Sequence, residues 1–238
     1  MIDFNVKSLV PICEKFALSL DKTAIDRLEL YGNLLLEWNE KMNLTAITEP
    51  VEVLYKHFYD CLLFFDAVDV PRGAKIIDVG TGAGFPGLVI KTARPDIDLT
   101  LLDSLGKRVT FLCEAANMLS LDVTAYHLRA EDGGQKPDLR EKFDIACARA
   151  VANLNALSEY CVPFVKPGGI FVAMKGKDAE LELDNARQAL SILGCKETKI
   201  INKTLRENEE RSFIIARKIS QTPPKYPRKS AKIAKAAL

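Results

Sequence analysis

The chain has 238 residues, of which 48% are hydrophobic and 27% are charged. This ordinary globular composition excludes disorder over most of the length, and the length suits one sizeable domain, alone or with a small helical addition. The formal net charge of +1 conceals an asymmetry, because Arg211 to Leu238 holds eight basic residues and no acidic one. The basic charge is therefore concentrated at the carboxy-terminal end.

Six cysteines, at positions 13, 61, 113, 147, 161 and 195, are scattered with no C-x-x-C pair. We interpret them as reduced, buried thiols, and with only His57 and His127 to join them we expect no metal site. The first residues lack a basic region followed by a long apolar run, and no apolar stretch is long enough to span a bilayer. The sequence therefore predicts a cytoplasmic protein without membrane contact.

Residues 4–68 follow a helical pattern. In the first long helix, apolar residues recur at spacings of three and four: Leu28, Tyr31, Leu35, Trp38 and Met42. We expect Thr48 to cap a second helix, with Glu49 and Pro50 in its first turn. Residues 1–70 are thus predicted to be a helical extension that packs on a sheet.

That second helix contains His57 and, three residues later, Asp60. Side chains at this spacing are neighbours on a helix surface, so a local polar pair is the favoured interpretation. A place in the pocket of a substrate is the alternative.

From residue 71 the pattern alternates between strands and helices. The predicted strands are 75–79, 99–102, 123–126, 143–148 and 170–174, and the predicted helices lie near 86–94, 105–119, 151–161 and 178–193. Such alternation is typical of a parallel, doubly wound sheet. Two further strands, 199–205 and 212–218, lack a helix between them, so we expect an antiparallel hairpin to finish the sheet. We assign residues 71–220 to this domain and 221–238 to a basic, mobile tail.

The first strand leads into a glycine-rich loop, KIIDVGTGAGFPG at 75–87. Glycines let the backbone approach a ligand closely, and the helix that follows offers unpaired N–H groups. Gly82, Gly84 and Gly87 by themselves also satisfy the dinucleotide fingerprint. Asp78 shifts the balance, because a carboxylate there would repel a pyrophosphate and attract a cationic ligand such as S-adenosylmethionine. The alternative is a purely structural role, in which the glycines only form a tight strand-to-helix turn and bind no ligand.

Four other residues belong to the same edge of the predicted sheet. Asp103 ends the second strand, 23 residues after Gly80, where it can accept both ribose hydroxyls of either cofactor or merely cap the next helix. Ala130 and Glu131 follow the third strand, where their backbone can bracket an adenine while the Glu131 side chain points to solvent. An ordinary polar turn is the equal alternative for this pair. Arg149 follows the fourth strand and needs a partner, such as a cofactor carboxylate or an RNA phosphate.

The terminal hairpin is uncommon in nicotinamide enzymes and characteristic of class I S-adenosylmethionine-dependent methyltransferases. The fold class predicted is therefore α/β, a Rossmann-like parallel sheet closed by an antiparallel hairpin. A nicotinamide oxidoreductase is the least favoured enzyme, because Asp78 and the hairpin both oppose it.

The chain closely resembles the ribosomal RNA small subunit methyltransferase G family, also called glucose-inhibited division protein B. The matching stretches are WNEKMNLTAIT, HFYDCL, DVGTGAGFPG, LLDSLGKRVTFL, the step Arg149-Ala150, KG at 175–176 and YPRK near the end. Together they cover most of the chain from about residue 35 onward. Two departures are Cys61, where the family commonly has serine, and the ending SAKIAKAAL, where the family often has proline.

The resemblance implies methylation of N7 of one guanosine in the decoding-region loop of 16S rRNA, with S-adenosylmethionine as the cofactor. The cofactor-site residues that it implies are Gly80, Phe85, Ala130, Glu131 and Arg149, to which the ribose argument adds Asp103. The implied partner is 16S rRNA or the small ribosomal subunit, either mature or as a precursor, and we expect a monomer.

Guanine N7 already carries a lone pair, so its methylation needs alignment and no general base. Consistently, the sequence has no Pro-Cys dipeptide like that of pyrimidine C5 enzymes, and its one Pro-Pro, in TPPK, is a chance match to the motif of amine methyltransferases. For RNA contacts the candidates are Lys107, Arg108, Arg129, Lys225, Arg228 and Lys229, with Tyr226 stacking on a base. The alternatives are a small-molecule methyltransferase and a non-catalytic RNA-binding protein of the same fold.

Overall fold

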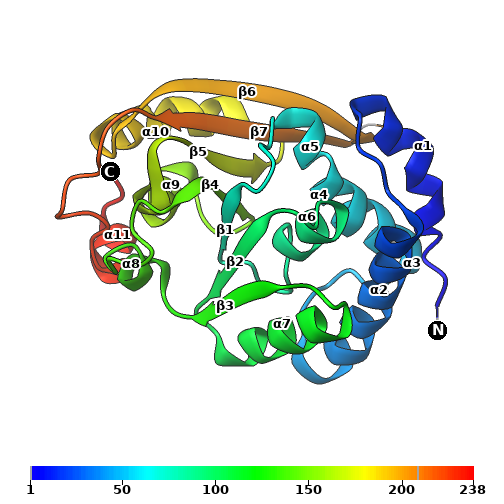
Figure 1. Ribbon diagram of the computed structural model, residues 1–238. Helices are drawn as coiled ribbons and strands as arrows, with labels where there is room; N and C mark the ends of the chain where they lie inside the picture. Colours follow the sequence, from blue (N-terminus) through cyan, green and yellow to red (C-terminus); the bar gives the residue numbers. More distant parts are fainter. Residues whose placement is uncertain (1, 208) are drawn as a thin grey trace.

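A seven-stranded sheet organises the molecule, as Figure 1 shows for the computed structural model, which describes residues 2–207 and 209–238. The strands are β1 (Lys75–Val79), β2 (Asp98–Asp103), β3 (Val123–His127), β4 (Phe143–Arg149), β5 (Val165–Lys175), β6 (Cys195–Arg206) and β7 (Glu209–Lys218). Their order is β3-β2-β1-β4-β5-β7-β6. The first five are parallel, and β7 runs antiparallel to both β5 and β6. The predicted sheet and its closing hairpin are confirmed; Asn208, in the predicted connection, lies outside the described residues.

Five helices connect the strands or precede the hairpin. They are α6 (Gly87–Ala93), α7 (Gly106–Met118), α8 (Ala130–Gly133), α9 (Leu154–Cys161) and α10 (Ala179–Ile192). The four predicted helices are confirmed to within three residues at each end. The largest difference is at α9, because residues 151–153 precede the helix instead of opening it.

The amino-terminal region is helical, as predicted. Its helices are α1 (Val10–Cys13), α2 (Lys22–Met42), α3 (Pro50–Val53), α4 (Asp60–Leu62) and α5 (Phe64–Ala67), with a π-helical turn at Leu54–Tyr59. Asp21 caps α2 by accepting the Ala24 N–H at 2.7 Å. Thr48 is not the cap of α3, as was expected; Glu49 holds that position without a side-chain bond, and Pro50 starts the helix with its preset φ.

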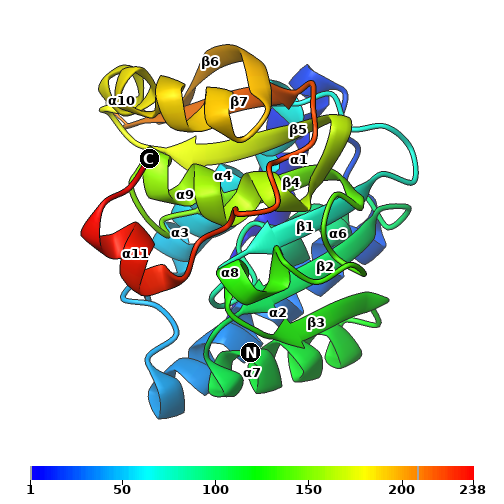
Figure 2. The same ribbon diagram turned by 90° about the vertical axis from the view of Figure 1, so that its left-hand side faces the viewer.

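Each face of the sheet is covered by its own layer of helices, as Figure 2 shows from the side. One apolar cluster joins the amino-terminal helices, α6 and α7 to the sheet, with Tyr31, Phe58 and Phe111 among its buried residues. The other lies under α9 and α10 and includes Leu157 and Phe171. The extension therefore shares its core with the sheet, while the division at residues 70 and 220 stays a prediction.

The carboxy-terminal segment differs from the expected mobile tail. After β7 it runs back over the molecule and ends in α11 (Ser230–Lys235), with Tyr226 and Ile233 only 6% and 1% exposed. Buried aromatic and aliphatic side chains hold it in place, and Tyr226 is therefore not displayed for stacking on a base.

Two other observations concern the described residues as a whole. None of their helices combines the length and the apolar composition needed to cross a membrane. All six cysteines are free, and five are buried as expected, but Cys113 is exposed because it faces outward from α7.

Candidate active site

The glycine loop at the end of β1 is held by Asp78, which is fully buried. Its Oδ2 accepts the Thr81 hydroxyl at 2.6 Å and the Gly87 N–H, at the start of α6, at 2.8 Å. Its Oδ1 has no hydrogen-bond partner among the described residues. Burial raises the pKa of this carboxyl to about 6, although both hydrogen bonds and Arg149 act to lower it.

Gly80 shows why this loop needs glycine. Its φ of +70° is a conformation that side chains rarely allow, and a Cβ would lie 2.8 Å from Cγ2 of Val151. Because residues 151–153 stay outside α9, Val151 reaches the loop from the end of β4. A side chain at residue 80 would therefore clash with Val151 as well as strain the turn.

Asp103 lies at the end of β2 and is 2% exposed. Its Oδ2 accepts the Gly82 N–H at 2.9 Å, and its Oδ1 accepts the N–H of Leu105, the residue before α7, at 2.9 Å. The capping role considered from the sequence is absent, because Leu105 is the N-cap of α7 and none of the N–H groups in the first turn of that helix has a side-chain acceptor among the described residues. A carboxylate has about four acceptor sites, so two remain for the hydroxyls of a ligand.

These elements enclose a cavity at the carboxyl edge of the sheet. It is lined by Val79, Gly80, Leu102, Ser104, Leu128, Arg129, Ala130, Glu131, Val151, Tyr160 and Ser230. Of the predicted residues, Gly80, Ala130 and Glu131 line it directly, whereas Asp103 does not, although its neighbours Leu102 and Ser104 do. The Glu131 side chain was expected in solvent, but it is only 6% exposed, because α8 folds it in toward the sheet.

The Arg149 side chain points away from that cavity, toward the amino-terminal helices. Its Nη1 donates to Oδ2 of Asp60 at 2.8 Å and to the Lys56 carbonyl at 2.9 Å. Asp60 is 2% exposed and also accepts from Nε of Arg211 at 2.7 Å. The expected partner of Arg149 therefore exists, and it is a residue of this chain.

His57 pairs with Arg149 and Thr45, and the proposed local pair with Asp60 is wrong. Arg149 Nη2 donates to Nδ1 of His57 at 3.1 Å, which leaves Nε2 to donate to Oγ1 of Thr45 at 2.9 Å. Burial and the Arg149 charge lower the pKa of His57 to about 3. The imidazole is consequently neutral across the physiological range.

The Phe85 ring packs against the side chains of both His57 and Arg149. The His57 ring stacks on it with 4.4 Å between centroids and 11° between planes, and the Arg149 guanidinium lies 5.0 Å from its centroid. Because Phe85 is 5% exposed, it fixes the position of the two side chains. It does not line the cavity beside Gly80.

A second cavity opens at the same sheet edge, beyond β4. It is lined by Ile47, Lys56, His57, Asp60, Arg149, Ala150, Met174, Lys175, Gly176 and Arg211. The chain at the end of β4 separates the two cavities, with Arg149 and Ala150 lining this one and Val151 the first. Sequence reasoning missed Thr45, Arg211 and Ser230; the motif WNEKMNLTAIT contains the first of these and was the available signal for it.

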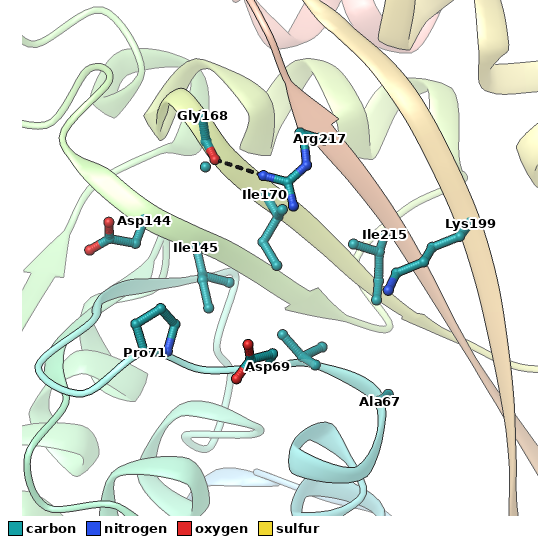
Figure 3. A pocket seen from close by; sticks show the side chains of 12 residues that line it. Ala67, Asp69, Pro71, Asp144, Ile145, Gly168, Ile170, Lys199, Ile215 and Arg217 are labelled. Atoms are coloured by element: carbon teal, nitrogen blue, oxygen red, sulfur yellow. Dashed lines mark hydrogen bonds between the residues drawn. The ribbon is translucent and has the colours of Figure 1, made fainter.

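A third cavity lies at the opposite edge, where the strands begin. Figure 3 shows Lys199 and Arg217 on one side of it and Asp69 and Asp144 on the other, with Arg217 donating to the Gly168 carbonyl at 3.1 Å. None of the predicted site residues lines this cavity. Within the described residues, no group of three or more His, Cys, Asp or Glu side chains is placed to hold a metal ion.

Solved structures of low sequence identity share this fold. An S-adenosylmethionine-dependent O-methyltransferase from Thermotoga maritima aligns with a TM-score of 0.53 at 17% identity, over 79% of this chain and 72% of that one. A geranyl diphosphate methyltransferase solved in complex with S-adenosylmethionine gives 0.54 at 13% identity, over 68% of this chain and 85% of that one. The fold is that of the class I S-adenosylmethionine-dependent methyltransferases, as predicted.

Sequence comparison gives the family. The profile described as rRNA small subunit methyltransferase G matches residues 24–214. The ribosomal RNA small subunit methyltransferase G of Clostridium perfringens is 46% identical over 232 residues, which is 95% of both chains. That of Acetivibrio thermocellus is 47% identical over 231 residues, 96% of this chain and 95% of that one. The chain belongs to the rRNA small subunit methyltransferase G family, and both findings support S-adenosylmethionine as its cofactor.

Proposed function

We propose that the protein transfers the methyl group of S-adenosylmethionine to N7 of one guanosine in the decoding-region loop of 16S rRNA. The observation that carries the proposal is the family match, because residues 24–214 include all six predicted cofactor-site residues. The family name supports small-subunit rRNA as the substrate, and the motif resemblance supports the nucleotide and the atom. Since ribosomal subunits are cytoplasmic, we expect the protein in the cytoplasm; its monomeric state stays a prediction.

The first cavity suits the adenosine part of the cofactor. Ala130 and Glu131 line this cavity, where their backbone would bracket the adenine. Asp103 lies beside it, between the lining residues Leu102 and Ser104, and has acceptor sites left for the ribose hydroxyls. Gly80 allows the turn of the glycine loop, and Asp78 contributes negative charge beneath that loop. The negative charge favours a cationic ligand over a pyrophosphate.

S-adenosylmethionine supplies a methyl group on a sulfonium, which makes its carbon electrophilic. The protein has to bring an acceptor lone pair in line with that carbon and to exclude water. Guanine N7 has such a lone pair in the plane of the base and carries no proton, so no residue has to act as a base. The positive charge leaves the sulfur and appears on the methylated base.

We place the acceptor base in the second cavity, because it shares the sheet edge and the end of β4 with the first. In-line transfer requires the two ligands to lie side by side, and the cavity in Figure 3 opens at the wrong edge. The pairs of Arg149 with Asp60 and His57 give this cavity fixed walls.

The experiment that tests this function is methyl transfer from labelled cofactor to small subunits isolated from a strain that lacks the gene. We expect incorporation into 16S rRNA and, by mass mapping, a single 7-methylguanosine in the decoding-region loop. Binding of S-adenosylhomocysteine without transfer to rRNA would reject the substrate and favour a small-molecule acceptor. A modified base other than guanine would reject the acceptor assignment alone.

A further inference from the structure

The cofactor cavity contains one residue from the far end of the chain. Ser230, the first residue of α11, lines it together with Gly80 and Glu131. Figure 2 shows α11 beside α8 and below α9, at the edge where the parallel strands end. The segment that carries Ser230 is therefore a neighbour of the cofactor-binding loop, although 150 residues separate it from Gly80.

A buried ion pair anchors this segment. Glu159 of α9 is fully buried, and its Oε1 accepts the backbone N–H of Arg228 at 2.7 Å and its Nε at 2.9 Å. Its Oε2 accepts Nη2 of the same arginine at 2.7 Å. A buried carboxylate is costly without such a partner, so Glu159 holds Arg228 two residues before Ser230.

The main chain before Arg228 is also bound to the body of the protein. Arg140 donates to the carbonyls of Thr222 and Tyr226 at 2.6 and 2.8 Å. Gln135 donates to the carbonyls of Pro224 and Pro227 at 3.2 and 3.0 Å. These contacts determine the path of the segment from β7 to the cavity.

We propose that the carboxy-terminal segment, residues 222–238, is a wall of the cofactor site, with Ser230 at the contact and Arg228 as its anchor. The inference rests on the proposed function, because it takes the cavity beside Gly80 to be the S-adenosylmethionine site. It changes the role expected for the tail, which becomes part of cofactor binding in addition to any contact with RNA. Removing the tail should therefore weaken cofactor binding.

The most direct test is to place a larger side chain at position 230, in the wall of the cofactor cavity. Ser230→Phe places an aromatic ring where the cofactor must lie, and we expect its dissociation constant for S-adenosylhomocysteine, measured by calorimetry, to rise at least about tenfold. The matched control is Ala231→Phe, because Ala231 is the next residue of α11 and is exposed. We expect the control to bind as the wild type does.

A second variant covers the case in which Ser230→Phe misfolds, which a melting curve without ligand would reveal. Deletion of residues 230–238 leaves Arg228 on Glu159 and removes the wall, so we expect weaker binding of S-adenosylhomocysteine with the sheet intact by circular dichroism. Wild-type affinity in a folded Ser230→Phe protein or in the deletion variant would overturn the proposal. A wild-type protein that binds no S-adenosylhomocysteine would instead reject the proposed function.

Discussion

Asp78 combines full burial, two accepted hydrogen bonds and one oxygen without a partner among the described residues. Burial disfavours the charged form of such a carboxylate relative to its protonated form, as its pKa of about 6 indicates. A cation near it relieves that cost. This gives a physical reason for an acid at the end of β1 in a protein that binds a sulfonium compound.

Asp78→Asn should reveal how much the buried charge of Asp78 lowers the free energy of unfolding. Because the folded pKa lies above the ordinary value, the wild type loses stability as pH rises from about 4 to about 6, by at most about 3 kcal/mol. The stability of the variant relative to the wild type should therefore grow over that range in urea unfolding. A difference that stays constant from pH 4 to pH 7.5 would contradict the pKa.

Asp60 is the other residue at which we expect a substitution to change the stability of the protein strongly. It is buried and pairs with both Arg149 and Arg211, so Asp60→Asn should lower the free energy of unfolding by about 3 kcal/mol. The control is Glu37→Gln, which removes an exposed pair with Lys41 and should have no measurable effect. Equal stabilities of the two variants would show that the buried pairs contribute nothing.

At the scale of elements, two segments outside the sheet shape the site. The π-helical turn Leu54–Tyr59 turns His57 and the Lys56 carbonyl toward Arg149, and such turns are frequent at functional sites. The segment with α11 turns Ser230 toward the cofactor cavity. Neither segment belongs to the sheet whose edge it completes.

The anchor of the carboxy-terminal segment can be tested through its dynamics. Arg228→Ala leaves Glu159 buried without its cation, so amide hydrogen exchange in residues 222–238 should become faster while β1 to β5 keep their protection. Lys229→Ala is the matched control, because its pair with Asp132 is exposed and weak. Unchanged exchange in Arg228→Ala would mean that other contacts suffice to hold the segment.

At the scale of the whole molecule, the charge is distributed unevenly despite a net charge of only +1. The basic residues of α11 lie at the end of the molecule far from α1, as Figure 1 shows. Lys232 and Lys235 are exposed on that helix. They are thus placed beside the carboxyl edge of the sheet, where an RNA substrate has to arrive.

Binding of small-subunit rRNA should depend on salt through this face. Replacing Lys232 and Lys235 by Gln should reduce the slope of log affinity against log salt by up to about 2. Lys7 and Lys15 are exposed and flank α1, which lies at the opposite end of the molecule, so replacing them should leave the slope unchanged. If both pairs alter the slope equally, RNA binding is spread over the surface and α11 has no special role.

The sequence by itself determined the sheet, its closing hairpin, the glycine loop and the family. These features are local, because hydrophobic periodicity, glycine positions and short motifs are properties of neighbouring residues. The acid at the end of each of the first two strands was predicted for the same reason. The predicted bounds of most strands and helices also agree with the observed bounds to within a few residues.

Only the tertiary structure decided where the longer side chains point. Arg149 pairs with Asp60, 89 residues away, and Ser230 reaches a cavity formed around Gly80. Glu131 is buried, although its side chain was expected to point to solvent. Such outcomes depend on partners that folding brings together from distant positions, and no local pattern specifies them, since each charged side chain has many possible partners along the chain.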